Sequence, residues 1–444
     1  MELKGRRVLV VGLARTGLAT ARFLVEQGAQ VTVTESKPRE AVAEAAAAVE
    51  PLGVSLEVGG HREATFAAAE LIVMSPGVPL DLPPARANGV QVVSEIELAA
   101  WFLRLPVVAV TGTNGKSTTT TLIGEMLRAG GRRAFVGGNL GTPLVTALLD
   151  AACWEIAVAE VSSFQLEAIE RFHAHVAVLL NVTEDHLDRH ESFKAYAQAK
   201  QAVFRNQGPE DWAVLNADDP VVEEMAGALR ARPLRFSRRG PVARGAWLEG
   251  ATIRVRLDRG EEAYPTGLLR VPGVHNLENA MAAILAARAC GVQPSAIAQA
   301  LAEFPGLPHR LEFVREVGGV RYYNDSKGTN VGAVVKSVSS FPGPLVLIMG
   351  GLDKGGSYAP LQDLVRERAR ALVVLGQARE RIRQALADVV PTTVADSFEE
   401  GVRQAAAAAR PGDVVLLSPG CASFDMFRNY EERGARFRAL VQAL

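Results

Sequence analysis

The fold is decided at Val107-Val-Ala-Val-Thr111-Gly-Thr-Asn-Gly-Lys116-Ser-Thr118, where an apolar run passes into a glycine-rich turn and then a helix-forming segment. Glycines let successive backbone N–H groups converge on anionic oxygens, and the start of the following helix adds a positive dipole. Lys116 is placed to reach the β- and γ-phosphates of a nucleotide, and the Ser117 hydroxyl to ligate Mg²⁺. The spacing Gly-x-x-Gly-Lys-Ser is tighter than the usual motif. The order of strand, turn and helix predicts a nucleotide-phosphate site, with a turn that binds no ligand as the alternative.

The composition indicates a protein of several domains without a nucleic-acid or membrane partner. A chain of 444 residues is long enough for about three domains, each with its own core. The chain has 48 Lys and Arg residues and 49 Asp and Glu residues, so its net charge is close to zero and would not attract polyanions. Cys153, Cys290 and Cys421 show no paired spacing, which argues against disulfides and zinc. No signal peptide and no apolar run of membrane-spanning length is found, so we expect a cytoplasmic location.

Short β-branched runs alternate with longer helical stretches almost throughout, which predicts an α/β fold of parallel sheets covered by helices. Breaks at Leu105-Pro106 and at Pro305-Gly-Leu-Pro308 separate three blocks. We therefore predict domains at residues 1–104, 105–307 and 308–444. Strands are expected at 7–11, 31–34, 71–74, 107–111, 156–159, 176–180, 212–215, 320–324, 345–349, 371–375 and 414–417, and helices at 18–27, 94–102, 119–128, 277–290 and 295–303.

A second glycine-rich turn, Gly12-Leu-Ala-Arg-Thr-Gly17, directly follows the first predicted strand. It resembles a dinucleotide-binding fingerprint without its second glycine, and Glu35 lies where a ribose-binding acid is expected. The turn and the following helix still offer backbone N–H groups to a phosphate. We interpret the segment as a site for a nucleotide diphosphate rather than a redox dinucleotide, and a tight turn without a ligand is the alternative.

Polar residues follow two further strands downstream of the phosphate turn. Glu160 comes directly after one apolar run and is well placed to hold Mg²⁺, although an isolated acid in this position would more often cap a helix. The segment Asn181-Val-Thr-Glu-Asp-His186-Leu-Asp188 follows the next run. His186, with its acidic neighbours, could therefore ligate a metal or orient a substrate.

Other polar residues of the middle block have ordinary structural explanations. Lys200 lies on a predicted helix, where a lysine is normally solvated. Asn276 and Asn279 share one face of a helix and could contact a base, although capping is the usual role of an asparagine such as Asn276. His173 and His175 lead into a strand without acidic neighbours and are assigned no role.

Three loops of the last block follow predicted strands and carry charged or hydroxyl side chains. Asp325 and Lys327 lie in the first of them, Lys354 in the second and Ser423 in the third. Ligands of open α/β sheets bind outside the carboxyl ends of the strands. All three loops are therefore candidates for substrate contacts.

Taken together, the motifs resemble the Mur ligase family from residue 7 to about residue 440. The resemblance is carried by Gly112-Thr-Asn-Gly-Lys-Ser-Thr118, Glu160-Val-Ser-Ser-Phe-Gln-Leu166, Asn181-Val-Thr-Glu-Asp-His186, His275-Asn276, Leu307-Pro-His-Arg310 and Asn324-Asp-Ser-Lys327. It implies a Rossmann-like N-terminal domain that binds a UDP-linked substrate, a P-loop ATPase-like central domain that binds ATP, and a Rossmann-like C-terminal domain that binds an amino acid. The Asp-Asn-Pro-Arg signature of diamino-acid-adding members is replaced here by Gly350-Gly-Leu-Asp-Lys354.

The resemblance implies an ATP-dependent amide ligase of peptidoglycan precursor synthesis, and hence a role in cell-wall biogenesis, cell shape and cell division. The implied reaction adds D-glutamate to UDP-N-acetylmuramoyl-L-alanine through an acyl phosphate, with two Mg²⁺ sites. A monomer is expected. L-glutamate stays open as the acceptor, because enantiomers differ only in how they fit the pocket.

The family's functional residues carry over by motif. The implied catalytic residues are Lys116, His186, Lys200 and Lys327, with Lys200 matching a lysine that the family carboxylates, and the implied metal ligands are Ser117, Glu160, His186 and Lys200. The implied ATP-binding residues are Gly112, Thr113, Asn114, Gly115, Lys116, Ser117, Thr118, Asn276, Asn279, Arg310 and Asp325. The implied substrate-binding residues are Arg15, Thr16, Glu35, Ser36, Lys37, Ser75, Gly77, Asn139, Ser163, Gln165, Thr329, Lys354, Ser423, Phe424 and Tyr430.

Three alternatives stay open at this point. Another amide ligase on the same scaffold, such as a different Mur ligase or a folylpolyglutamate synthase, would use the same phosphate turn. A nucleotide-dependent switch would need no Glu160, His186 or Lys200. A nicotinamide oxidoreductase is disfavoured by the incomplete fingerprint at Gly12-Leu-Ala-Arg-Thr-Gly17.

Overall fold

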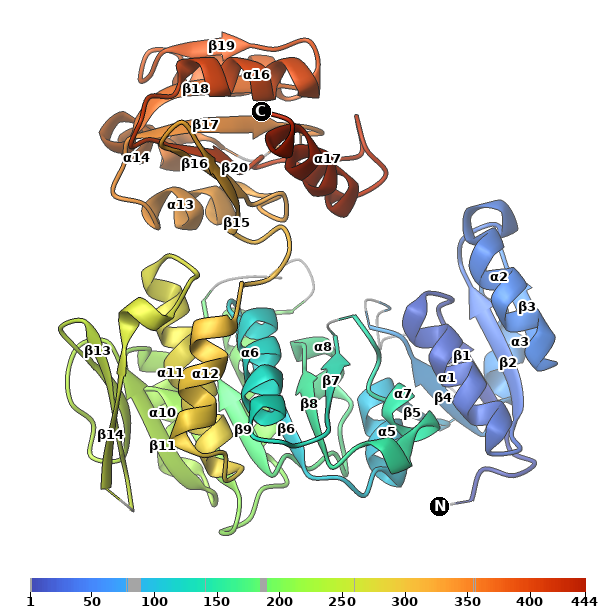
Figure 1. The fold of residues 1–444 in the computed structure, drawn as a ribbon. Helices are drawn as coiled ribbons and strands as arrows, with labels where there is room; N and C mark the ends of the chain where they lie inside the picture. The colour runs from blue at the N-terminus through green and yellow to red at the C-terminus, as the bar shows by residue number, and fades with distance from the viewer. Residues whose placement is uncertain are drawn as a thin grey trace. The chain divides into compact units, whose positions relative to one another are not determined.

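The computed structural model describes residues 2–76, 78, 89–139, 141–183, 190–258, 260–353, 355 and 357–444 (Figure 1). Three predicted site residues, Gly77, His186 and Lys354, lie outside this part of the chain. The chain forms two compact units, Met1–Leu268 with Glu278–Leu301 and Leu269–Leu277 with Ala302–Leu444. The first unit contains two of the sheets and the second unit contains the third.

The first sheet is entirely parallel, with the strand order β3-β2-β1-β4-β5. Its strands are β1 (Arg7–Val11), β2 (Gln30–Glu35), β3 (Ser55–Val58), β4 (Leu71–Met74) and β5 (Gln91–Ser94), and its helices are α1 (Arg15–Glu26), α2 (Ala43–Val49), α3 (Glu63–Ala68) and α5 (Glu95–Phe102). In this strand order β1 lies at the centre of the sheet, with β2 and then β3 on one side of it. A parallel sheet of this kind brings the carboxyl ends of all its strands to one edge.

The second sheet has nine strands in the order β14-β13-β12-β11-β10-β9-β6-β8-β7. Its strands are β6 (Val107–Thr111), β7 (Ala134–Gly138), β8 (Ile156–Glu160), β9 (Val176–Leu179), β10 (Trp212–Asn216), β11 (Arg232–Ser237), β12 (Gly245–Glu249), β13 (Thr252–Leu257) and β14 (Gly260–Pro265). The helices of this region are α6 (Lys116–Ala129), α7 (Thr146–Leu149), α8 (Ser163–Glu167), α9 (Phe193–Gln201), α10 (Pro220–Met225), α11 (Val274–Ala289) and α12 (Pro294–Glu303). The strand before the phosphate turn, β6, lies between β8 and β9, so the turn opens at the middle of a parallel edge.

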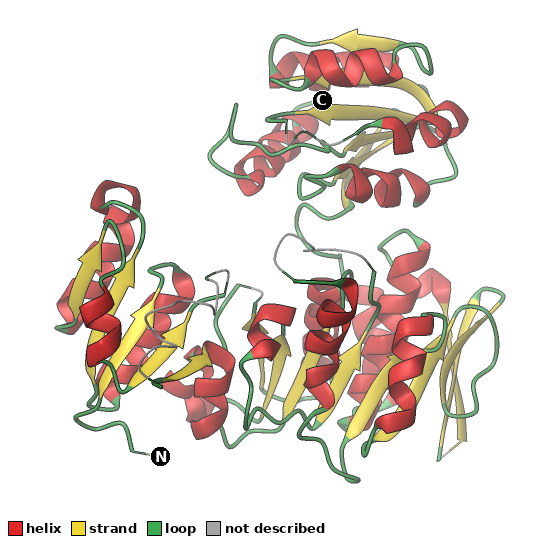
Figure 2. Cartoon of the chain, turned by 180° about the vertical axis from the view of Figure 1, so that it is seen from behind, coloured by secondary structure: helices red, strands yellow, loops and turns green. Residues whose placement is uncertain are grey.

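The third sheet has the order β15-β16-β20-β17-β18-β19. Its strands are β15 (Glu312–Val317), β16 (Val320–Asn324), β17 (Leu345–Gly350), β18 (Ala369–Leu375), β19 (Thr392–Val394) and β20 (Val414–Leu417), and its helices are α13 (Val331–Ser339), α14 (Gln362–Arg368), α15 (Arg379–Leu386), α16 (Phe398–Ala408) and α17 (Tyr430–Gln442). Side chains of a strand alternate between its two faces. On β17, Leu345 and Leu347 join one core cluster and Val346 and Ile348 join another, so helices cover both faces of this sheet (Figure 2).

The predicted α/β fold is confirmed, but the expectation of purely parallel sheets is wrong at two edges. Strands β12, β13 and β14 continue the second sheet as an antiparallel meander, and β15 pairs antiparallel with β16. The meander is rich in alternating Arg and Glu, as in Arg254, Arg256 and Glu261, which gave no apolar run by which to predict a strand. The strands nevertheless bury alternate side chains, such as Ile253 and Val255 of β13, which are both 0% exposed, so they have one buried face.

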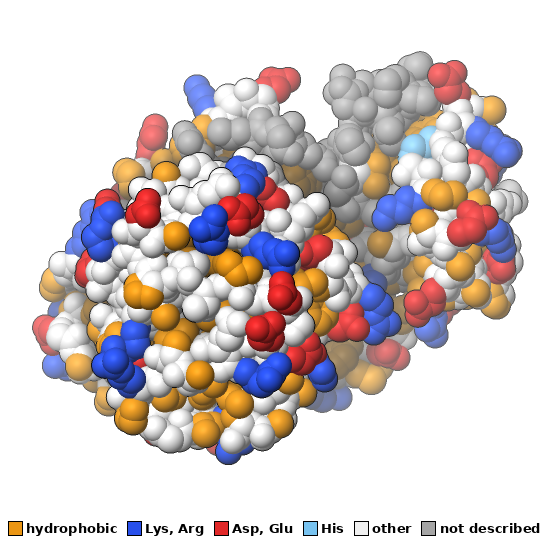
Figure 3. Space-filling model, turned by 90° about the horizontal axis from the view of Figure 1, so that it is seen from above, with side chains coloured by type: hydrophobic (Ala, Val, Ile, Leu, Met, Phe, Trp, Pro, Cys, Tyr) orange, Lys and Arg blue, Asp and Glu red, His pale blue; other side chains and the backbone are white. Residues whose placement is uncertain are grey.

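The distribution of charged side chains on the surface agrees with the nearly equal numbers of basic and acidic residues. On the face drawn in Figure 3, Lys and Arg side chains lie interspersed with Asp and Glu. Among the described residues, no helix is both long enough and apolar enough to cross a bilayer.

Two buried glutamates of α5 accept hydrogen bonds from the backbone of the region around the second sheet, and so link the two sheets of the first unit. The Glu97 carboxylate accepts the backbone N–H groups of Glu170, Arg171 and Phe172 at 2.9, 2.8 and 2.9 Å. Glu95, which is 0% exposed, accepts the N–H of Val145 at 2.6 Å, while its Oε2 has no hydrogen-bond partner within the described residues. Burial raises the pKa of Glu95 to about 7, against the lowering effect of its backbone donors.

We expect Glu95→Gln to remove a pH dependence of stability. A carboxyl whose pKa is raised from 4.5 to about 7 in the folded chain stabilises it fully below pH 4.5, and the benefit is lost as the pH rises to about 7. Relative to wild type, the variant should therefore gain up to about 3 kcal/mol between pH 4.5 and pH 7. Thermal unfolding from pH 4.5 to 8 measures this difference, with the exposed Glu44→Gln as control. A constant difference across the range would contradict the assignment.

Candidate functional site

The glycine-rich turn after β6 has the conformation of a phosphate loop. Gly112 and Gly115 adopt φ values of 147° and 87°, which L side chains rarely tolerate, and α6 begins at Lys116. A Cβ on Gly115 would lie 2.2 Å from Oδ1 of Asn279. Asn279 therefore lies directly against the loop, and only glycine fits between them. The start of a fourteen-residue helix beside these backbone N–H groups is a ready anion site.

Residues from neighbouring strands and α9 hold the loop. The Asn181 side chain accepts the Asn114 N–H at 2.8 Å and donates to the Asn114 carbonyl at 3.1 Å. The Thr113 hydroxyl accepts the Thr183 N–H at 3.0 Å and lies 3.1 Å from the Tyr196 hydroxyl. The loop is thus preorganised by contacts that do not involve a ligand. None of Asn181, Thr183 and Tyr196 was among the predicted site residues, although Asn181 and Thr183 belong to the motif that ends at His186.

Two lysines converge on one carbonyl of the loop. Nζ of Lys116 donates to the carbonyls of Gly112 and Thr113, at 2.9 Å each, and Nζ of Lys200 donates to the Gly112 carbonyl at 2.8 Å. Lys200 is only 2% exposed, and its Nζ lies 4.5 Å from the centre of the Tyr196 ring. The solvated helix lysine expected from the sequence alone is therefore wrong, and the structure places Lys200 beneath the phosphate loop.

Glu160 ends β8 beside the loop and offers an uncommitted carboxylate oxygen. It is 3% exposed, and its Oε1 accepts from Nδ2 of Asn139 at 2.8 Å. Its Oε2 is buried and has no hydrogen-bond partner among the described residues. A buried carboxylate oxygen without a donor suits a cation, because carboxylate and hydroxyl oxygens are the ligands that Mg²⁺ prefers. Within the described residues, no group of three or more His, Cys, Asp and Glu side chains could hold a metal.

His190 is a buried histidine that the sequence did not single out. Its Nε2 lies 3.1 Å from the Ser163 hydroxyl and its Nδ1 lies 3.1 Å from Oε1 of Glu167. The ring stacks on Phe164 at a centroid distance of 5.3 Å and meets the Tyr196 ring edge-on at 5.1 Å. His190 therefore joins α8, with the predicted substrate residue Ser163, to the tyrosine that contacts the phosphate loop.

At the first sheet, Glu35 binds the backbone of the glycine-rich turn. Its carboxylate accepts the N–H of Leu13 at 2.8 Å, the N–H of Lys37 at 3.0 Å and the Ser36 hydroxyl at 3.2 Å. Burial acts to raise the pKa of Glu35, but these hydrogen bonds lower it overall. Arg15 and Thr16 begin α1 beside it. The structure thus brings five predicted substrate residues to one edge of this sheet.

Gly12 and Gly17 allow the tight turn there. Gly12 has a φ of 97°, and a Cβ on Gly17 would lie 1.9 Å from the Gly12 carbonyl oxygen. The Ser75 hydroxyl lies 3.4 Å from the same oxygen, so Ser75 supports this turn from the end of β4. A residue larger than glycine at position 17 would force α1 away from the sheet.

In the second unit, Asp325 and Lys327 follow β16. Oδ2 of Asp325 accepts the hydroxyls of Ser337 and Ser418 at 2.6 and 2.8 Å, and burial raises its pKa to about 6. The Asp325 carboxylate therefore links its loop to α13 and to the end of β20. Nζ of Lys327 donates to the Tyr430 hydroxyl at 2.9 Å and lies 4.3 Å from the centre of that ring.

Arg433 of α17 is the largest fully buried side chain of the described residues and was not predicted from the sequence. It donates to the Ser326 hydroxyl and carbonyl at 3.0 and 2.8 Å and to the Cys421 carbonyl at 3.2 Å. Burial lowers its pKa to about 10. Arg433 therefore joins the loop of Lys327 to the loop of Ser423. An arginine on an amphipathic helix gives no sequence signal of such a role.

His309 positions the Lys327 loop against α17. The backbone carbonyl of His309 accepts the Lys327 N–H at 3.0 Å, and its Nδ1 lies 3.0 Å from Nδ2 of Asn324. A Cβ on Gly434 would lie 2.1 Å from Nδ1 of His309. Only glycine at position 434 lets the imidazole pack on the helix.

We expect Gly434→Ala to lower kcat roughly 100-fold, because displacing His309 moves the Lys327 loop. The thermal midpoint should also fall, since the added methyl overpacks the site. The matched control is Gly332→Ala in α13, where the added Cβ would lie at an ordinary 3.5 Å from Oδ1 of Asn330. Equal activity of both variants would exclude this role for Gly434. Steady-state kinetics and thermal melts provide the measurements.

Of six other predicted residues, one lies in the first unit and five lie in the second unit. The first unit holds Gln165, whose Oε1 completes a capping box with Ser162 at the start of α8. The second unit holds Asn276, Arg310, Thr329, Ser423 and Phe424. Ser423 is 2% exposed, whereas Phe424 is 68% exposed. Nδ2 of Asn276 donates to the Pro272 carbonyl at 2.6 Å, a contact in the first turn of α11 that differs from the N-cap bond considered in the sequence, in which the side chain would accept.

The fold and the site define an α/β nucleotide-phosphate-binding protein, with a glycine-rich loop at a central parallel strand and an acid at the end of the adjacent strand. Three family models match the chain: the Mur ligase MurD-like N-terminal domain at residues 6–94, the Mur ligase middle domain at 110–287 and the Mur ligase glutamate ligase domain at 309–421. The chain belongs to the Mur ligase family. The predicted family and its three-domain α/β fold are therefore confirmed.

Relatives and solved structures agree with this assignment. The chain is 51% identical to a UDP-N-acetylmuramoylalanine--D-glutamate ligase of Geotalea daltonii over 100% of this chain and 99% of the relative. It is 50% identical to the ligase of the same name from Geobacter metallireducens, with the same coverage. The fold is similar to that of UDP-N-acetylmuramate-alanine ligase from Thermotoga maritima, with a TM-score of 0.62, 20% identity and 99% of each chain covered. The Acinetobacter baumannii MurF structure gives a TM-score of 0.62 at 19% identity over 100% of this chain and 91% of that one.

Proposed function

We propose that the protein is an ATP-dependent ligase that joins D-glutamate to UDP-N-acetylmuramoyl-L-alanine in peptidoglycan precursor synthesis. The observation that carries this proposal is the full-length identity of 50–51% to relatives that bear the name of this activity. The phosphate loop and the uncommitted oxygen of Glu160 support it chemically. We expect a monomer in the cytoplasm, with domain boundaries at residues 104/105 and 307/308.

The first step that we propose is phosphoryl transfer to the L-alanyl carboxylate. A carboxylate oxygen forms a bond to the γ-phosphorus, the bond from that phosphorus to the bridging oxygen breaks, and ADP leaves. Both reactants are anionic, so cationic groups must neutralise the charge that gathers at the phosphoryl oxygens. Lys116 supplies one such group from the loop, and the backbone N–H groups at the start of α6 supply fixed dipoles.

Glu160 and Ser117 would hold a Mg²⁺ ion beside the loop, with His186 and Lys200 proposed at a second site. When bound, the metal neutralises phosphate charge. Asn139 holds Glu160 through the 2.8 Å hydrogen bond to its Oε1, and the second carboxylate oxygen would then be available to a cation. A carbamate on Lys200 would replace its positive charge by a negative one, and the buried position of Nζ beside Gly112 sets it near the loop.

The second step that we propose is attack of the D-glutamate amine on the acyl carbon. A carbon–nitrogen bond forms, the carbon–oxygen bond to the phosphate breaks, and the proton that the amine loses leaves with the phosphate, so an amide and inorganic phosphate result. Lys327 is proposed to bind ATP phosphates together with Arg310 and Asp325. Thr329, Lys354, Ser423, Phe424 and Tyr430 are proposed to hold the amino acid, and Asn276 and Asn279 the nucleotide.

An acceptor assay tests this function. Purified protein receives ATP, Mg²⁺ and UDP-N-acetylmuramoyl-L-alanine with D-glutamate, L-glutamate, L-alanine or meso-diaminopimelate, and phosphate release is measured. We expect release that depends on D-glutamate. A preference for another amino acid would indicate a different ligase of the family. ATP hydrolysis that is independent of any acceptor would indicate a nucleotide switch.

A further inference from the structure

A double-glycine turn after β3 places the exposed imidazole of His61 beside residues 35–37, which are predicted to bind the UDP-linked substrate. The N–H groups of Gly59 and Gly60 donate to the carbonyls of Lys37 and Glu35 at 2.9 and 3.3 Å. The φ values of Gly59 and Gly60 are 81° and 147°, in the region that favours glycine. The chain therefore doubles back onto residues 35–37 and presents His61 at the carboxyl edge of the first sheet.

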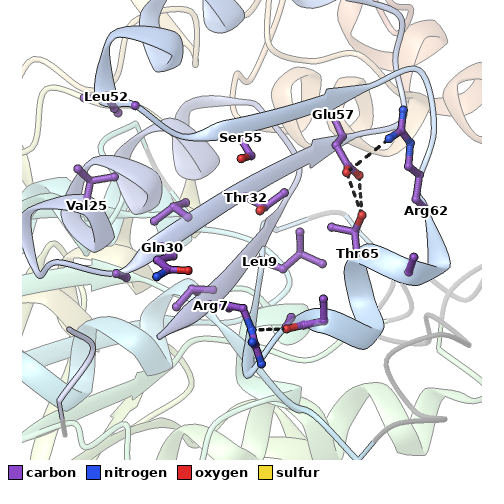
Figure 4. A pocket seen from close by; sticks show the side chains of 17 residues that line it. Arg7, Leu9, Val25, Gln30, Thr32, Leu52, Ser55, Glu57, Arg62 and Thr65 are labelled. Carbon is purple, nitrogen blue, oxygen red and sulfur yellow. Dashed lines mark hydrogen bonds and ion pairs between the residues drawn. The ribbon is translucent and has the colours of Figure 1, made fainter. Parts of the chain in front are cut away.

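The start of α3 fixes His61 from the other side. The Thr65 hydroxyl donates to the Glu57 carboxylate at 2.9 Å, and Arg62 pairs with Glu57 at 3.9 Å. Figure 4 shows both contacts, on the side chains that line a pocket of about 720 Å³ against the face of β2 and β3. The His61 ring also meets the buried Phe66 ring edge-on, at a centroid distance of 6.0 Å. The backbone on both sides of His61 and the ring itself are thus held in place.

Thr34 engages one of the two ring nitrogens of His61. The Thr34 hydroxyl lies 2.9 Å from Nδ1 of His61 and 3.4 Å from the carbonyl oxygen of Gly60. Whichever of the two atoms donates, the 2.9 Å contact occupies Nδ1, so Nε2 is the ring nitrogen left for a ligand. Thr34 is 0% exposed and His61 is exposed. The fixed ring therefore presents Nε2 to a ligand at this edge.

We propose that His61 is a specificity-determining residue that donates to the O4 carbonyl of uracil, an inference that rests on the proposed UDP-linked substrate. The sheet order is β3-β2-β1, with the phosphate-binding turn after β1 and Glu35 at the end of β2. A nucleoside diphosphate that lies along this edge passes from phosphate to ribose to base, so the base reaches the turn after β3. Uracil has an acceptor at position 4, whereas cytosine has an amino donor there, which would oppose the His61 N–H.

Binding titrations of UDP and CDP to the full chain, without ATP or amino acid, test the proposal. The variants are His61→Phe, which keeps the ring contact with Phe66 but lacks the donor, and His61→Gln, whose amide restores one. The control is His173→Phe, because His173 is another half-exposed imidazole, paired with Asp211 at 2.7 Å. We expect His61→Phe to weaken UDP binding about tenfold and CDP binding little, with most of the UDP affinity kept by His61→Gln.

The same titrations separate the possible failures. Unchanged UDP affinity in His61→Phe, or an equal loss of UDP and CDP binding, would overturn the role of His61 while wild-type UDP binding still supports the proposed function. Absence of UDP binding by the wild type would refute the proposed substrate, and the role of His61 with it. An unchanged KM for ATP in His61→Phe is expected, and a raised one would point to a structural effect instead.

Discussion

Replacing Lys116 with alanine is expected to lower kcat of the ligation roughly a thousandfold, because the variant loses a cation at the phosphoryl group during transfer. The loop itself should persist, since Asn181, Thr183 and Tyr196 hold it through hydrogen bonds that do not use Lys116. The KM for D-glutamate and the binding of UDP-N-acetylmuramoyl-L-alanine should therefore change little. Steady-state kinetics and a binding titration of the UDP substrate measure the two effects separately.

The matched control for Lys116 is Lys194→Ala, which removes an exposed lysine of α9 and should leave kcat unchanged. Near-wild-type turnover of Lys116→Ala would contradict the assignment of the phosphate loop. Equal loss of UDP-substrate binding would instead indicate that the substitution disturbs the whole first unit.

Replacing Glu160 with glutamine is expected to lower kcat roughly 100-fold and also to raise the Mg²⁺ concentration for half-maximal activity. The amide keeps an acceptor for the Asn139 hydrogen bond, seen at 2.8 Å, but removes the charge that would attract the ion. Burial makes this charge effective, because Glu160 is only 3% exposed and little water screens it. Mg²⁺ titrations of the initial rate provide the measurement.

Glu155→Gln offers a control for Glu160 near the opposite end of the same strand. Glu155 is a surface residue that pairs with Arg132 and Arg133 and lies just before β8. Its substitution should alter neither kcat nor the Mg²⁺ dependence. A Glu160→Gln enzyme with an unchanged Mg²⁺ titration would show that the uncommitted oxygen does not serve a metal.

Much of the fold could be predicted because its central strands are short apolar runs followed by glycine turns. Strands β1, β4, β16 and β20 begin and end at the predicted residues. Runs of mixed polarity, such as β3 and β13, were not predicted, because apolar and polar residues alternate in them and form no continuous apolar run. The short strands β5 and β19 were missed for the same reason.

The part of the site that a motif encodes was predicted from the sequence, and the part that depends on packing was not. The glycines and Lys116 of the phosphate turn are local in sequence, so their role follows from spacing alone. Lys200 and Arg433 reach their partners only after the chain has folded, across separations of 88 and 107 residues to Gly112 and Ser326. A single sequence carries no record of such contacts.

The most direct test follows the oxygen atoms of the substrate. UDP-N-acetylmuramoyl-L-alanine labelled with oxygen-18 in its terminal carboxylate is incubated with ATP, Mg²⁺ and D-glutamate, and the released phosphate is examined by mass spectrometry. Activation as an acyl phosphate predicts one labelled oxygen in each phosphate released, together with ADP. Unlabelled phosphate alongside amide product, or the formation of AMP and pyrophosphate, would contradict it.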